Sequence, residues 1–325
     1  MKKPKSEIEN ARKIFEEIKT AMSGIIIGQE KAVDSVILTL FCNAHSMIVG
    51  VPGLAKTLII KTLSQIIEAD FNRIQFTPDL MPSDITGTIL LSSIEEGRQY
   101  KFIKGPVFTN LLLADEINRT PPKTQSALLQ AMEERFVTAE GESHELPRLF
   151  NVFATRNPIE QEGTYPLPEA QLDRFMFQIE IDYPNAEDER LIIEKKHINE
   201  TFEGVKKVAS VMDIISAQDI IDDVPAASNI IDFAMNLTRN SRPETTKSAL
   251  VKEFVRWGAS PRAGIYLLKA AKAHALLSGR LAVDMEDVAK HVYLIMKHRI
   301  ILSFKGEMEN INKDEIIEEI IKTSY

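Results

Sequence analysis

The feature that most restricts the fold of this chain is an eight-residue segment between a short apolar run and a helical pattern. Residues 46–50, Ser-Met-Ile-Val-Gly, have the apolar, partly β-branched character of a buried strand. The segment Gly50-Val-Pro-Gly-Leu-Ala-Lys-Thr57 follows, and helical periodicity resumes from Thr57 to Ile67. A strand, a glycine-containing loop and a helix in this order predict the opening unit of a parallel α/β sheet.

This segment contains the residues that a phosphate-binding loop requires. The backbone N–H groups of such a loop surround phosphate oxygens, and the following helix N-terminus adds unpaired donors with positive partial charge. We expect Lys56 to reach the β- and γ-phosphates of a nucleotide, and the Thr57 hydroxyl to bind Mg²⁺. Ala55 stands where glycine is usual, and its aversion to positive φ constrains the loop. The alternative is a structural turn with a chance Lys-Thr pair. The predicted nucleotide-binding residues are Gly50, Val51, Pro52, Gly53, Leu54, Ala55, Lys56 and Thr57.

Two acidic residues end a second apolar run. Residues 110–114, Asn-Leu-Leu-Leu-Ala, lead directly into Asp115 and Glu116. Open α/β sheets bind their ligands beyond the carboxyl ends of the strands. We therefore expect Asp115 to hold Mg²⁺, largely through water, and Glu116 to orient and deprotonate an attacking water. The alternative is a strand that stops at a solvated charge pair, and the upstream loop argues against it.

The order of strand and helix patterns predicts two domains. Three further apolar runs suit strands covered on both faces, at residues 73–77, 150–154 and 175–181. They complete a predicted parallel five-stranded sheet, and residues 87–105 form a predicted inserted β-hairpin. After Pro184 the strand patterns give way to helical ones. We predict an α/β core over residues 1–184, including an N-terminal helix, and an all-helical domain over residues 185–325.

Composition excludes several classes of protein. The formal net charge of -8 gives no sign of the broad basic face that a nucleic-acid-binding protein needs, so nucleic acid is an unexpected partner. The single cysteine, Cys42, cannot form an internal disulfide bond. No apolar run approaches the roughly 18 residues that span a bilayer, and the charged first residues do not resemble a secretion signal. We expect a cytoplasmic protein.

Four segments together resemble the MoxR family of AAA+ ATPases. They are residues 50–57; residues 113–130, Leu-Ala-Asp-Glu-Ile-Asn-Arg-Thr-Pro-Pro-Lys-Thr-Gln-Ser-Ala-Leu-Leu-Gln; residues 154–175, Ala-Thr-Arg-Asn-Pro-Ile-Glu-Gln-Glu-Gly-Thr-Tyr-Pro-Leu-Pro-Glu-Ala-Gln-Leu-Asp-Arg-Phe; and residues 258–263, Gly-Ala-Ser-Pro-Arg-Ala. The resemblance extends from about Ile27 to Ser303, and Ala55 is normal for this family. It implies a P-loop NTPase fold with an AAA+ core and a C-terminal helical lid.

The resemblance also implies roles for individual residues. Asn157 matches the sensor-one residue beside the γ-phosphate, and Gln29 lies in the segment near the adenine. Arg174 matches the arginine finger that reaches a neighbouring subunit's nucleotide, and Arg262 matches the sensor-two arginine. The structural alternatives are a surface ion pair for Arg174 and an ordinary turn for Asn157. Arg156 departs from the pattern, which has Gln there, and this leaves open how its loop meets its neighbours.

The function implied by the resemblance is ATP hydrolysis that drives chaperone-like remodelling or maturation of partner proteins. ATP and Mg²⁺ are the implied cofactors, a homo-oligomeric ring, a hexamer, is the implied assembly, and proteins with a von Willebrand factor A domain are implied clients. Three alternatives stay open: a magnesium-chelatase-like subunit for metal insertion, a nucleic-acid motor and a non-enzymatic nucleotide-binding scaffold. The acidic balance argues against the motor on nucleic acid. Intact Lys56, Asp115, Glu116 and Asn157 argue against the scaffold.

Overall fold

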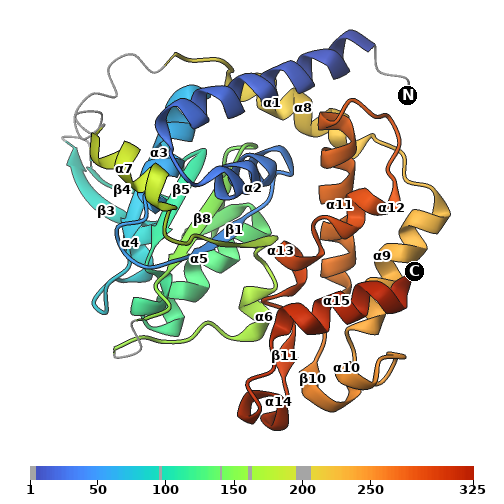
Figure 1. Ribbon diagram of the computed structural model, residues 1–325. Helices are drawn as coiled ribbons and strands as arrows, with labels where there is room; N and C mark the ends of the chain where they lie inside the picture. Colours follow the sequence, from blue (N-terminus) through green and yellow to red (C-terminus); the bar gives the residue numbers. More distant parts are fainter. Residues whose placement is uncertain (1–4, 95–96, 140, 160–162, 195–205) are drawn as a thin grey trace.

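The computed structural model describes residues 5–94, 97–139, 141–159, 163–194 and 206–325. Figure 1 shows a sheet with helices packed around it and a mostly helical lid at its side. The sheet is parallel and has the strand order β2-β5-β8-β1-β9. Its strands are β1 (Ser46–Val49), β2 (Phe71–Gln75), β5 (Leu111–Asp115), β8 (Asn151–Arg156) and β9 (Phe177–Glu180). The predicted α/β class and parallel five-stranded sheet are confirmed.

The helices fall into two groups along the chain. Those up to residue 194 are α1 (Lys5–Ile25), α2 (Glu30–Phe41), α3 (Lys56–Ile66), α4 (Pro82–Thr86), α5 (Pro122–Glu134), α6 (Glu169–Leu172) and α7 (Ala186–Glu194), with a 3-10 turn over Ile117–Arg119. Those after residue 205 are α8 (Val211–Asp222), α9 (Ser228–Asn240), α10 (Ala249–Phe254), α11 (Pro261–Leu277), α12 (Met285–Ala289), α13 (Val292–Met296), α14 (Phe304–Met308) and α15 (Lys313–Ser324).

Both faces of the sheet are covered, which explains why its strands are continuously apolar. In β5, Leu111 and Leu113 belong to an apolar cluster that includes residues of α1, α2 and α3, whereas Leu112 and Ala114 belong to a cluster that includes residues of α5. Every residue of β5 is buried. Since alternate residues of a strand point to opposite faces, a strand between two layers of helices needs apolar residues at every position.

The predicted hairpin is present as a separate antiparallel pair. Strand β3 (Gly87–Ile94) pairs with β4 (Gly97–Lys104), with Gly87 opposite Lys104. Residues 95–96 of the predicted tip lie outside the described residues. A second hairpin, β6 (Phe136–Ala139) with β7 (Glu142–Glu145), was not predicted, because Glu-Ser-His-Glu in β7 has no apolar alternation to indicate a strand. At the start of α5, Pro121 is the N-cap residue.

The lid is helical, with one addition to the all-helical domain that was predicted. Strands β10 (Val255–Trp257) and β11 (Ile301–Leu302) form a short antiparallel pair at one end of the lid (Figure 1). Helix α1 contacts α3 of the core as well as α8 and α11 of the lid. The predicted domain boundary at residue 184 stays a prediction. Within the described chain, no helix combines the length and apolar character needed to cross a membrane.

Candidate functional site

The loop after β1 crosses the carboxyl end of the sheet and enters α3 at Lys56. Gly53 has a φ of +87° and Ala55 a φ of +57°, so the alanine adopts the left-handed conformation that constrains this position. That conformation costs a non-glycine residue roughly 1–2 kcal/mol. Lys56 Nζ lies 2.6 Å from the carbonyl oxygen of Gly50, so its side chain folds back across the loop. Ala55 is the N-cap residue and makes no side-chain cap, which leaves the first N–H groups of α3 available to an anion.

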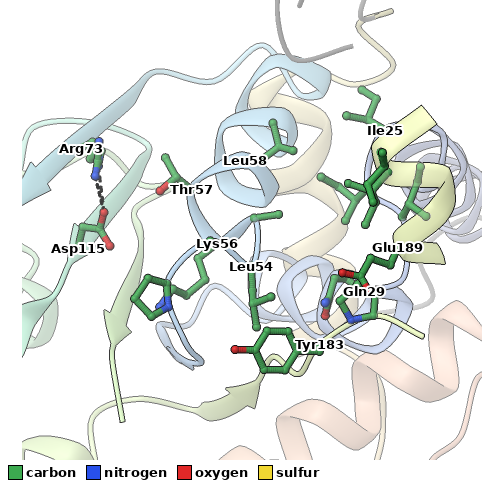
Figure 2. A pocket seen from close by; sticks show the side chains of 18 of the residues that line it. Ile25, Gln29, Leu54, Lys56, Thr57, Leu58, Arg73, Asp115, Tyr183 and Glu189 are labelled. Carbon is green, nitrogen blue, oxygen red and sulfur yellow. Dashed lines mark hydrogen bonds and ion pairs between the residues drawn. The ribbon is translucent and has the colours of Figure 1, made fainter. Parts of the chain in front are cut away.

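A cavity of about 800 Å³ opens beside this loop, and its two ends differ in chemistry (Figure 2). The polar end is lined by Lys56, Thr57, Arg73, Asp115 and Glu116. The other end is mostly apolar, with one carboxylate, and is lined by Ile25, Ile26, Ile27, Gln29, Tyr183, Pro184, Glu189, Ile192 and Ile193. Figure 2 shows Gln29 and Tyr183 on the side of the loop away from the Arg73–Asp115 pair. A charged end joined to an apolar end matches a ligand with a polyphosphate and a flat base.

Asp115 ends β5 with a buried carboxylate that already has two partners. Its Oδ2 lies 2.6 Å from Arg73 Nη2, and its Oδ1 accepts a 2.5 Å hydrogen bond from Thr155 Oγ1. Thr57 and Asp115 both line the cavity, and hydroxyl and carboxylate oxygens are the ligands that Mg²⁺ prefers. These two residues therefore fit a magnesium ion at the polar end.

Glu116 follows Asp115 in a left-handed conformation, with a φ of +58°. Its Oε2 accepts a 2.7 Å hydrogen bond from Gln75 Nε2 and lies 3.1 Å from Arg119 Nε. Its backbone N–H donates to Thr155 Oγ1 at 2.8 Å. The carboxylate thus lies at the cavity, held by two side chains, where it can accept a proton from a water molecule.

Sequence reasoning missed the two β2 residues that contact the acidic pair. Arg73 and Gln75 alternate with Ile74, which is buried, and they point together toward the ends of β5. In the register of the sheet, Gln75 lies opposite Asp115. The only sequence signal was the polar-apolar-polar order of these three residues, and that order does not identify the neighbouring strand.

Asn157 lies buried directly after β8, and its Oδ1 accepts a 3.2 Å hydrogen bond from the backbone N–H of Ile159. It is not among the described residues that line the cavity. It does follow the carboxyl end of a strand at the same edge of the sheet as the acidic pair. Arg156 has an exposed side chain, and its carbonyl oxygen accepts from the N–H of Gly50 at 3.3 Å. Residues 160–162 of the predicted motif lie outside the described residues.

Arg174 and Arg262 meet each other through a carboxylate and do not line their own chain's cavity. Arg174 Nη2 lies 2.5 Å from Glu133 Oε2, and its Nη1 donates to the carbonyl oxygen of Leu129 at 2.6 Å. Arg262 Nη2 lies 3.0 Å from Glu133 Oε1, and its Nη1 lies 3.6 Å from Asp173 Oδ2. Both guanidinium groups are therefore gathered at the end of α5, and both are partly exposed.

Gln29 joins two segments that form the apolar end of the cavity. Its Nε2 donates a 2.8 Å hydrogen bond to the carbonyl oxygen of Asp182. Ile192 and Ile193 of α7 and the exposed Tyr183 complete this end. These residues were not predicted, because α7 was not recognised in the acidic sequence that follows Pro184.

Cys42 lies in the packed core and not in the cavity. Burial raises the pKa of its thiol to about 12, so it stays protonated at neutral pH. Burial likewise lowers the pKa of His45 to about 3, and its Nδ1 accepts a 2.9 Å hydrogen bond from the N–H of Val152. Both groups are explained by packing.

Comparisons with known proteins agree with this geometry. The family described as "ATPase family associated with various cellular activities (AAA)" matches residues 45–177, and the "AAA lid domain" family matches residues 247–320. The protein "Chaperone MoxR1" of Mycobacterium tuberculosis is 40% identical over 96% of this chain and 81% of its own length. The protein "Protein MoxR" of Paracoccus denitrificans is 29% identical over 92% of this chain and 91% of its own length.

A solved structure of a protein described as a candidate ATPase, from Cytophaga hutchinsonii, superposes with a TM-score of 0.90. It is 37% identical in sequence, and the match covers 98% of this chain and 96% of that one. The overall fold is thus shared with a protein of known structure. This chain belongs to the MoxR family of AAA+ ATPases.

Proposed function

We propose that this ATPase hydrolyses ATP in a Mg²⁺-dependent reaction and, as a ring of identical subunits, uses that reaction to remodel partner proteins. One observation carries the proposal: the loop with Lys56 and Thr57 and the acidic pair of Asp115 and Glu116 line one cavity. Phosphoryl transfer needs positioned charge more than covalent chemistry, and these are the groups that supply it. The proposed domains are a nucleotide-binding core over residues 1–184 and a lid over residues 185–325.

The residues have the following proposed roles. Lys56 and the N–H groups at the start of α3 hold the phosphates, and Gln29 lies beside the base. Thr57 and Asp115 hold Mg²⁺, which when bound neutralises charge on the β- and γ-phosphates. Glu116 orients the attacking water and accepts its proton. Asn157 supports this water from the end of β8.

Arg174 is proposed to act as an arginine finger on the nucleotide of a neighbouring subunit, and Arg262 is proposed to be the sensor-two arginine. Both guanidinium groups are partly exposed, their carboxylate partners are Glu133 and Asp173, and neither is among the described residues that line the cavity of their own chain. A cationic side chain outside its own site can still stabilise the transferring phosphoryl group of another site. A catalytic site that uses groups from two subunits supports a ring, for which we propose six subunits.

The clients proposed are proteins that need maturation, among them proteins with a von Willebrand factor A domain. The name of the relative in Mycobacterium tuberculosis, "Chaperone MoxR1", supports a chaperone-like role. Purifying a Glu116→Gln chain after ATP loading, with its bound proteins, would identify the client. Recovery of a chelatase subunit in place of such a client would favour the metal-insertion alternative.

Lys56→Ala is expected to weaken nucleotide binding about 10- to 100-fold, because it removes a charge-assisted contact to the phosphates. Titration with a fluorescent ATP analogue measures this loss. Lys61→Ala is the matched control, since Lys61 lies in the same helix with an exposed side chain outside the cavity. Equal affinity of Lys56→Ala and wild type would contradict the assignment of the phosphate site.

The β3–β4 hairpin is a candidate for the element that contacts a client. Among its residues whose side chains are described, Phe102 alone packs against a core cluster, and the hairpin follows α4 near the carboxyl ends of the strands. Figure 1 shows it extending from the sheet on the side away from the lid.

Replacing residues 92–98 with a short Gly-Ser linker is expected to spare basal ATP turnover and to remove its stimulation by a client. The residues that the structure shows lining the cavity all come from other segments, so the chemistry should persist. Steady-state ATPase assays with and without the client measure both properties. Retention of full stimulation would show that the hairpin tip has no role in the response to a client. Loss of basal turnover would show that the tip is needed for folding or assembly.

A further inference from the structure

The segment that carries Arg174 is hydrogen-bonded to the core through its N–H groups and to the lid through its carbonyl groups. This segment, residues 173–176, joins α6 to β9. Each of its four backbone N–H groups donates to the core: to the carbonyl oxygens of Glu169, Gln171, Leu172 and His45, in chain order. Each of its four carbonyl groups accepts instead from a lid side chain.

Two lid residues supply most of these contacts to the carbonyl groups. Arg299, which follows α13, donates to the carbonyl oxygens of residues 173, 175 and 176 at 2.8, 2.7 and 3.2 Å. The hydroxyl of Tyr266 in α11 donates to the carbonyl oxygen of Arg174 itself at 3.1 Å. The lid therefore contacts every backbone carbonyl group of residues 173–176.

Arg299 is well placed to fix this segment rigidly. It is buried, with 6% of its surface exposed, and its guanidinium lies 5.2 Å from the ring centre of Tyr266. Its Nε also contacts Asp173 Oδ1 at 2.7 Å, and the hydroxyl of Ser260 donates to Asp173 Oδ2 at 2.8 Å. A planar guanidinium fork with several acceptors loses little freedom for each bond formed, which suits it to a fixed geometry.

We propose that Tyr266 and Arg299 are positioning residues that set the location of Arg174 relative to the neighbouring subunit's nucleotide. This inference rests on the proposed function, in which Arg174 acts across a subunit interface. The lid then contributes to catalysis in the next subunit through the backbone that displays the arginine. Misplacing a group that contacts the transition state by about 1 Å costs on the order of 10²-fold in rate.

Tyr266→Phe tests this with the smallest change, because it removes one hydroxyl and keeps the ring beneath Arg299. We expect kcat to fall about three- to tenfold, from the loss of one hydrogen bond, while nucleotide affinity stays unchanged. Arg299→Lys keeps the charge but loses the fork, and we expect kcat to fall about 10²-fold. Tyr293→Phe is the matched control, since Tyr293 lies in α13 with its side chain 38% exposed.

Mixed rings separate positioning from a general structural defect. A Tyr266→Phe subunit has an intact cavity and a misplaced Arg174. A Lys56→Ala subunit has a defective cavity and a correctly placed Arg174. Co-assembled rings, verified by sequential purification through two tags, should recover wild-type turnover at each intact cavity that faces a Lys56→Ala neighbour. Arg174→Ala mixed with Lys56→Ala is run in parallel.

The outcomes distinguish the inference from the function on which it rests. Recovery with both Arg174→Ala and Tyr266→Phe supports the positioning role. Recovery with Arg174→Ala alone overturns that role and leaves the shared site standing. Recovery with neither overturns both, and wild-type kcat in Tyr266→Phe and Arg299→Lys alike also overturns the positioning role.

Discussion

Alanine in place of Arg174 is expected to lower ATP turnover about 10³- to 10⁵-fold while leaving nucleotide affinity close to that of the wild type. The lost guanidinium would stabilise the charge that develops on the transferring phosphoryl group, so the effect falls on the chemical step. Arg174 does not line its own cavity, and for this reason binding of ATP should persist. Turnover of assembled rings and titration with an ATP analogue measure the two quantities.

The control for this experiment is Arg148→Ala. Arg148 forms an ion pair with Asp219, and its side chain is 62% exposed, so its loss removes a surface pair of small energetic value. A turnover for Arg174→Ala within a few-fold of the Arg148→Ala value would show that Arg174 has only a structural pairing role with Glu133.

Glu116→Gln is expected to lower turnover about 10²- to 10⁴-fold, because an amide cannot accept the proton of the attacking water. The substitution preserves the shape of a side chain that is held by Gln75 and Arg119, and it does not touch Lys56 or Thr57. ATP affinity should therefore stay the same, and the variant should accumulate in the ATP-bound state. Single-turnover hydrolysis with a separate binding titration resolves the two effects.

Glu134→Gln is the matched control for this second substitution. Glu134 lies exposed near the end of α5 and accepts a 2.9 Å hydrogen bond from Gln130, outside the cavity. It should hydrolyse ATP at the wild-type rate. If Glu116→Gln did the same, the proton acceptor would be another group.

Local sequence was sufficient for the parts of the site that lie on one continuous segment. The loop from Gly50 to Thr57 and the acidic pair after β5 each combine an element boundary with reactive side chains, so periodicity and residue type together located them. Their meeting at one cavity followed from the rule that parallel strands present their carboxyl ends at one edge.

Other parts of the site depend on contacts between segments far apart in the sequence. Arg73 contacts Asp115 because of the register between β2 and β5, and Arg262 meets Arg174 only through Glu133. Neither pairing has a signature in the spacing of residues. The hairpin of β6 and β7 was not predicted for a different reason: the exposed polar residues of β7 show no alternation of apolar and polar side chains. The cytoplasmic location stays a prediction.

The packing of α1 has a mechanical consequence for an assembly of such chains. One apolar cluster contains Ile18 of α1, Ile48 of the sheet, and Ile221 and Leu267 of the lid. A core and a lid that share a large apolar contact do not rotate freely against each other, because hinge motion there would expose apolar core surface to water. Half-exposed ion pairs, such as those around Glu133 and the pair of Arg148 with Asp219, have small energetic value and can shift at lower cost than this apolar contact. If the proposed ring forms, we expect each protomer to move largely as one rigid unit, so that force passes by tilting of whole protomers against one another.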